Sequence, residues 1–262
     1  MRSIATLALL AATPASAQVP AGYSLVWSDE FDRAGQPDPA KWIADTQFNK
    51  TGWFNDERQY YAAGRPENAR IEDGRLIITA RRETLSKARD FGGQQYTSAR
   101  LITRGKAEWT YGYFEIRAKL PCGQGTWPAI WTLGNGDWPD AGEIDIMEQV
   151  GAKPDELLGT IHNRGTAGTP GDGSRIHYPG MCDAFHTYTL DWTPAALKIA
   201  VDGTPVHTYA KAGKSAAGWP FDKPQYLILN LAVGGVLGGK VDDTIFPRRF
   251  EVDYVRVYQR KG

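Results

Sequence analysis

Short segments in which apolar and polar residues alternate are the feature that most constrains the fold of this chain. In the segment 111–120, Phe114, Ile116 and Ala118 alternate with polar or charged neighbours, a pattern typical of a strand with one buried face. No segment between these stretches carries the sustained three-to-four-residue apolar spacing of an amphipathic helix. The pattern therefore excludes α/β folds and predicts an all-β protein of antiparallel sheets.

The turns between these segments predict how the strands connect. Gly, Pro and Asp separate about a dozen or more short segments, as in a two-sheet β-sandwich of jelly-roll type. Asp73-Gly74 within 68–82 and Asp202-Gly203 within 197–209 are tight hairpin turns, whereas the Gly/Thr/Pro-rich stretch 165–173 is expected to be a loop. Because no break in composition divides the 262 residues, we expect a single domain.

The N-terminus has the pattern of a secretory signal peptide. Arg2, the apolar run 4–12 and Ala15-Ser16-Ala17 predict a signal peptide at 1–17, with cleavage between Ala17 and Gln18. The mature domain would then be 18–262, secreted to the periplasm or the extracellular medium. No later stretch reaches about 18 uninterrupted apolar residues, so we expect no membrane anchor, and we expect a monomer.

The charge and aromatic content restrict the class of partner. Lys plus Arg and Asp plus Glu number 30 each, which makes nucleic acids and anionic membranes poor partners. A neutral polysaccharide suits this balance. The nine Trp, twelve Tyr and nine Phe either cover sugar rings or fill the core of the sandwich.

Cys122 and Cys182 are the two cysteines of the chain. In an oxidising compartment we expect them to pair, and closing a loop of about sixty residues stabilises a fold by about 4 kcal/mol in the chain-entropy model. Their spacing does not resemble that of a zinc site.

The segment Gly142–Glu148 concentrates three acids in six residues. Strand alternation would place Glu143 and Asp145 on one face and Glu148 on the other. One extra residue, a β-bulge near Ile146-Met147, would return Glu148 to the face of the first two acids. We predict this bulge.

Paired carboxylates on one face are the chemical groups of glycoside hydrolysis, and a separation of about 5–5.5 Å favours retention. Crowded like charges keep one carboxyl protonated near neutral pH, which suits a general acid. The alternative is a solvated, merely acidic strand face. The preceding segment 126–131 brings in two tryptophans, and this favours the catalytic interpretation.

Here the chain resembles a known family, the laminarinase-like glycoside hydrolases of family 16. The motifs that carry the resemblance are GEIDIME at 142–148, GQGTWPAIWTLG at 123–134, YGYFEIRAKLP at 111–121, WSDEFD at 27–32, FNDERQYY at 54–61 and EVDYVRVYQ at 251–259. The resemblance implies a concanavalin-like jelly roll with an open substrate cleft on its concave face. It also implies Glu143 as nucleophile, Glu148 as acid/base and Asp145 as the acid that steers the nucleophile. The extra residue before Glu148 resembles the β-1,3-glucanase and agarase branches more than the lichenase branch.

Several further residues are candidates for substrate binding. Trp127 and Trp131 are four residues apart and share a strand face, and the family places this pair in the sugar-binding cleft. The family likewise places the residues that match Asn55 and Glu57 in the cleft, although both are also typical of a surface turn.

His162, Asn230 and Arg100 complete the candidate substrate set. His162 follows the acids by one strand and would hydrogen-bond a sugar or Glu148, or simply be a half-buried histidine. Asn230 is polar within an apolar strand and requires a partner, either substrate or backbone. Arg100 is a candidate without a specific partner.

A structural calcium ion is implied by the resemblance alone. The family often binds one on the face away from the cleft, and the matching positions are Glu30, Gly74 and Asp253. Oxygen ligands suit this hard cation. We expect no cofactor in catalysis.

Together these features predict a secreted, endo-acting, retaining β-glucanase that cleaves β-1,3 bonds in laminarin-like glucans. The same residues are compatible with agar, carrageenan or mixed-linkage β-glucan as the substrate, and with transglycosylation. A glycan-binding sandwich without catalysis is the alternative from another class.

Overall fold

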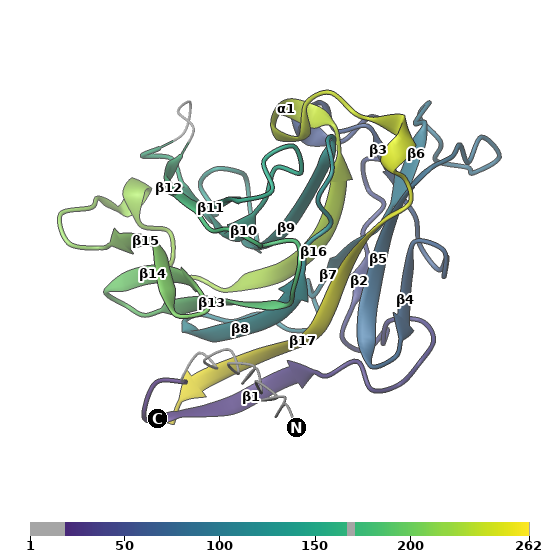
Figure 1. The fold of residues 1–262 in the computed structure, drawn as a ribbon. Coiled ribbons are helices and arrows are strands. Elements are labelled where there is room, and N and C mark those ends of the chain that lie inside the picture. The colour runs from purple at the N-terminus through teal and green to yellow at the C-terminus, as the bar shows by residue number, and fades with distance from the viewer. Residues whose placement is uncertain (1–18, 167–170, 262) are drawn as a thin grey trace, which may run out of the picture.

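Two sheets pack face to face in the computed structural model (Figure 1). The structure describes residues 19–166 and 171–261. The expected signal peptide at 1–17, and the cleavage site before residue 18, lie outside these residues and stay predictions. Within the described part of the chain, no helix is long and apolar enough to cross a bilayer.

The larger sheet has ten strands in the order β15-β14-β13-β8-β17-β5-β6-β3, with β1 paired to β17 and β4 paired to β5. All its pairs are antiparallel except β3 with β6. The strands are β1 (Tyr23–Asp29), β3 (Gln59–Tyr61), β4 (Ala69–Glu72), β5 (Arg75–Arg82), β6 (Tyr96–Ser98), β8 (Gly112–Lys119), β13 (His186–Trp192), β14 (Ala196–Val201), β15 (Thr204–Ala210) and β17 (Arg248–Arg260).

The smaller sheet has seven antiparallel strands in the order β12-β11-β10-β9-β16-β7-β2. They are β2 (Ile43–Ala44), β7 (Arg100–Ile102), β9 (Thr126–Gly134), β10 (Glu143–Glu148), β11 (Glu156–His162), β12 (Asp172–His177) and β16 (Gln225–Val233). The described helices are short: α1 (Gly235–Gly238), and the 3-10 turns η1 (Phe54–Asp56), η2 (Ala216–Gly218) and η3 (Asp243–Ile245).

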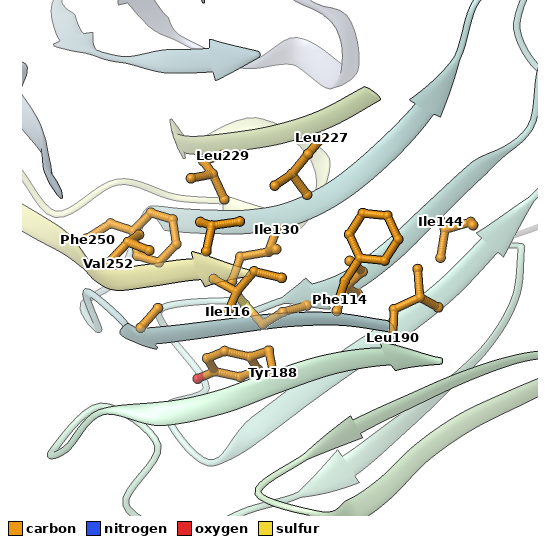
Figure 2. Close-up of a cluster of buried hydrophobic side chains, with 14 of the residues drawn as sticks. Phe114, Ile116, Ile130, Ile144, Tyr188, Leu190, Leu227, Leu229, Phe250 and Val252 are labelled. Atoms are coloured by element: carbon orange, nitrogen blue, oxygen red, sulfur yellow. The ribbon is translucent and has the colours of Figure 1, made fainter. Parts of the chain in front are cut away.

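The core lies between the two sheets and is built by every second residue of the central strands (Figure 2). Phe114 and Ile116 of β8 meet Ile130 of β9 and Leu229 of β16, and all four are fully buried. Because these apolar residues recur with a period of two, the opposite side chains of each strand point out of the sandwich. The predicted two-sheet sandwich is therefore confirmed, with one parallel pair that the sequence did not predict.

Two expectations about local structure were wrong. Residues 165–173 were expected to form one loop, but β12 begins at Asp172; this strand carries one large aliphatic residue, Ile176, so its apolar pattern is weak. The segment 98–102 was expected to be a single strand, but the chain passes from the larger to the smaller sheet at Ala99. A chain that passes from one sheet to the other keeps the same alternation of apolar residues, so the sequence pattern does not reveal the change of sheet.

The structure joins Cys122 and Cys182 in a disulfide, with 5.8 Å between their Cα atoms. This separation lies within the usual range for a disulfide. The bond links the loop before β9 to the loop before β13, one strand from each sheet. The expected pairing is confirmed.

Candidate functional site

The three acids of β10 lie on one face because the strand contains a bulge. Asp145 and Glu148 are three residues apart, but their partners on β9 are only two residues apart. Ile146 and Met147 are both fully buried in the core between the sheets. Glu148 therefore returns to the outward face on which Asp145 lies, as the sequence predicted.

Glu143 and Asp145 each lie close to a ring nitrogen. The indole Nε1 of Trp138 donates a hydrogen bond to Oε2 of Glu143 at 2.7 Å. The ring of His162 lies opposite Glu143 on β11, with its Nε2 3.2 Å from Oδ2 of Asp145. The contact of His162 is thus with Asp145, whereas one alternative had been Glu148. In the described part of the chain, Glu143, Asp145 and His162 are the one set of three potential metal-ligand atoms gathered within 4.8 Å.

Glu143, Asp145 and Glu148 form a row along the outward face of β10, called the acid row below. Glu148 has a separate donor at the other end of this row. The indole Nε1 of Trp127 donates to Oε1 of Glu148 at 3.0 Å. Trp127 is 6% exposed, so its ring has little surface for stacking on a sugar in this arrangement. Its position beside the acids agrees with the prediction, and its observed contact is with Glu148.

The acids have raised pKa values because they are buried together. Burial, followed by the charge of Asp145, raises the pKa of Glu143 to about 8. Burial and the charge of Glu148 raise the pKa of Asp145 well above its usual range. Burial also raises the pKa of Glu148, while its hydrogen bond from Trp127 lowers it. The row therefore retains protons near neutral pH, as a general acid requires.

A chain of hydrogen bonds links Trp131 to Glu57 through residues from three strands and one loop. Trp131 Nε1 donates to Oδ1 of Asn230 at 2.7 Å, and Nδ2 of Asn230 donates to the hydroxyl of Tyr61 at 3.0 Å. The Tyr61 hydroxyl and Gln59 Nε2 donate to Oε2 of Glu57 at 3.2 and 2.7 Å. The partners of Asn230 in the structure are side chains and not the backbone; a contact of Asn230 with substrate stays a prediction.

Arg100 is fully engaged by the protein. Its Nε lies 2.9 Å from Oδ2 of Asp45, and its guanidinium lies over the rings of Trp53 and Trp131 at 5.2 and 4.7 Å. A guanidinium on one face of Trp131 fixes the ring and leaves only its other face for a ligand. Arg100 therefore supports Trp131, and a direct contact with substrate stays a prediction.

Glu57 and Asn55 lie at the rim of the acid row. Burial raises the pKa of Glu57, and the charge of Glu57 in turn raises the pKa of Glu148, which places the two carboxyls near each other. Asn55 is exposed in η1 with a φ of 58°, and its carbonyl oxygen lies against Gly235 of α1. No contact in the structure tests a substrate role for Asn55.

The residues of the expected calcium site are engaged otherwise. The carboxylate of Glu30 accepts hydrogen bonds from Nε and Nη2 of Arg256 at 3.0 and 2.8 Å, and Asp253 accepts one from Arg117 at 2.5 Å. Gly74 lies in the turn between β4 and β5. As arranged, each of the two carboxylates is paired with an arginine, and a bound cation would have to displace these contacts. Calcium stays a prediction, which melting temperatures with and without EDTA would check.

Three residues of the site were missed in the sequence. Trp138 is exposed in the loop before β10, where no periodicity draws attention to it, although it stands only five residues before Glu143. Gln59 and Tyr61 lie within a motif that was noted, FNDERQYY, but their partners are far away in sequence. An aromatic residue close to a row of acids is the signal that would have identified Trp138.

Comparison with known proteins supports the resemblance. A sequence model for glycosyl hydrolases family 16 matches residues 56–256. A beta-glucanase of Rhodothermus marinus is 49% identical over 253 residues, which cover 90% of this chain and 85% of that protein. A glucan endo-1,3-beta-glucosidase of Cryptopygus antarcticus is 39% identical over 254 residues, covering 88% and 90%. The crystal structure of SCLam, a non-specific endo-beta-1,3(4)-glucanase, has 51% identity and a TM-score of 0.90, and covers 94% of each chain.

Proposed function

This chain belongs to glycosyl hydrolase family 16, and from that premise we propose that it is a secreted, endo-acting β-glucanase that hydrolyses β-1,3 bonds in laminarin-like glucans with retention. The bulge in β10 carries this proposal, because it brings Glu143 and Glu148 to one face. A binding protein would have no need of two half-buried glutamates with raised pKa values.

The reaction we propose has two steps. A carboxylate oxygen of Glu143 attacks the anomeric carbon while Glu148 protonates the departing glycosidic oxygen, so that one C–O bond forms and another breaks. Glu148 then takes a proton from water, and the resulting hydroxide displaces Glu143 from the sugar. Asp145, between them, steers Glu143. No cofactor takes part in either step.

Separate contacts hold the two glutamates. Each accepts a hydrogen bond from a different indole, Glu143 from Trp138 and Glu148 from Trp127. Two separate donors fix two side chains in two orientations. Burial raises the pKa of Glu143 to about 8 and that of Glu148 to about 7, so the assignment of nucleophile and acid rests on the family resemblance. The charge of His162 opposes the rise at Glu143, in the direction of the ionised form that a nucleophile needs.

The substrate class follows from the relatives. Those compared above are called beta-glucanase and glucan endo-1,3-beta-glucosidase, which favours a β-1,3-glucan cleaved within the chain. SCLam is called a non-specific endo-beta-1,3(4)-glucanase, so mixed-linkage β-glucan is the second candidate substrate. Export, a monomeric state and an open cleft over the acid row belong to the same proposal.

The central test is Glu143→Gln, assayed on laminarin, lichenan, agarose and carrageenan. We expect wild type to cleave laminarin, and the variant to lose at least about a thousandfold in kcat while still binding the glucan. The matched control is Glu72→Gln, which changes an exposed glutamate on β4 and should keep full activity. Proton NMR of the first anomer released tests retention. Wild type without hydrolysis on any of the four polymers would refute the proposal.

A further inference from the structure

Trp138 differs from every other tryptophan of the chain. All nine lie in the part of the chain that the structure describes, and Trp138 alone is exposed, with 56% of its surface accessible. An exposed indole is normally free to donate to water. The N–H of Trp138 instead donates to Oε2 of Glu143 at 2.7 Å, so a solvent-facing ring is bonded to the glutamate that we assign as nucleophile.

The loop that carries Trp138 is held at both ends. The Gly134 amide donates to the Gly142 carbonyl at 3.0 Å, and the Ala141 amide donates to the Asp137 carbonyl at 2.9 Å. The guanidinium of Arg164, just after β11, donates two hydrogen bonds to the carboxylate of Asp140. These contacts join the loop to the strands that flank the acid row. Trp138 therefore has a fixed base from which to orient Glu143.

We propose that Trp138 is a positioning residue for hydrolysis: its indole N–H fixes the rotation of the Glu143 carboxylate, and its exposed ring forms an apolar platform for the sugar next to Glu143. The inference rests on the proposed function. A carboxylate held by one donor attacks along one direction, which lowers the barrier to the first step. The flat face of the indole covers the apolar face of a sugar ring, so substrate binding and nucleophile orientation meet in one side chain.

The hydrogen bond also affects ionisation. Glu143 is surrounded by Asp145, His162 and Trp138, with Glu148 further along the strand. The bond from Trp138 lowers the pKa of Glu143 against the effect of burial. Removing the N–H therefore raises the pKa of Glu143, and the nucleophile becomes ionised only at a higher pH.

The test compares Trp138→Phe, Trp138→Ala and wild type on laminarin across pH. The Phe variant keeps a flat ring and loses the N–H, so we expect kcat to fall about tenfold with KM nearly unchanged. We expect the acid limb of kcat/KM to move to higher pH. The Ala variant should show the same kcat loss and, in addition, a KM several-fold higher. Because Trp138 is exposed, both variants should melt within a few degrees of wild type.

The matched control is Trp219→Phe. Trp219 is buried, and its Nε1 donates to Oδ1 of Asp222 at 2.9 Å, so the variant removes the same type of bond away from the acid row. We expect the wild-type pH profile and kcat. A Trp138→Phe enzyme with wild-type kcat and an unmoved acid limb would overturn the inference even if wild type hydrolyses laminarin. A wild type that cleaves no glucan would refute the proposed function itself.

Discussion

Replacing Glu143 by glutamine should make the protein more stable, and increasingly so as pH rises. The pKa of Glu143 is raised from its ordinary value of 4.5 to about 8, chiefly by burial. Between these two values the folded protein holds a proton that the unfolded chain has released, so wild type loses stability as pH rises through this window. Glutamine has a similar shape and does not titrate. The stability difference between variant and wild type should therefore grow from pH 4.5 to pH 8 and then level off.

The size of the effect follows from the pKa. One pH unit corresponds to 1.36 kcal/mol, so the rise from 4.5 to about 8 sets an upper bound of about 5 kcal/mol. Asp145 and Glu148 share the titration with Glu143, and the Glu143 side chain is partly exposed. We therefore expect the variant to gain about 2 kcal/mol in the free energy of unfolding at pH 8. For a domain of this size, that corresponds to a melting temperature about 4–8 °C higher at pH 8.

The assay is thermal unfolding from pH 4.5 to pH 9, followed by circular dichroism. Glu72→Gln is the matched control, because a hydrogen bond from Arg70 lowers the pKa of Glu72, so its stabilising contribution is present above the ordinary pKa and is lost on acidification. The control should gain nothing at high pH. If the Glu143 variant gained the same number of degrees at pH 5 and pH 8, or melted lower than wild type at pH 8, the reasoning would be refuted.

Three further predictions concern the contacts around the acids and the disulfide. Trp127→Phe removes the N–H that lowers the pKa of Glu148; Glu148 then keeps its proton longer, so the basic limb of kcat/KM should move to higher pH. Asn230→Ala breaks the hydrogen bonds on both sides of a buried amide and should lower stability by about 2 kcal/mol, read from chemical denaturation. Replacing both Cys122 and Cys182 by serine should cost about 4 kcal/mol, whereas an unchanged denaturation midpoint would show that the bond contributes nothing.

The sequence was sufficient for the central strands because a period of two leaves few alternatives. The hairpin at Asp202-Gly203 and the alternation around Phe114 predicted real elements. The bulge in β10 could be predicted for a chemical reason: an even alternation would have separated Glu148 from the other two acids. In each case the residues that determine the element are neighbours in the sequence.

What could not be predicted depends on residues far apart in the chain. Trp131 and Asn230 are 99 residues apart, and no local pattern says that one bonds the other. The same holds for Arg100, which is 55 residues from Asp45. β12 escaped prediction because an edge strand with few apolar residues has the composition of a loop. Sequence patterns thus indicate which face a side chain occupies, and the partner on that face comes only from the fold.

The bulge has a consequence for insertions and deletions in this strand. Because Ile146 and Met147 together occupy the core side opposite a single step of β9, one of them is surplus to the alternation. If Met147 were deleted, strict alternation would still place the three acids on one side of β10. Asp145 and the last glutamate would still lie opposite Trp131 and Ala129 of β9. The one-sided arrangement of the acids is thus compatible with two different backbone lengths, and a strand one residue shorter would keep the chemistry that we propose.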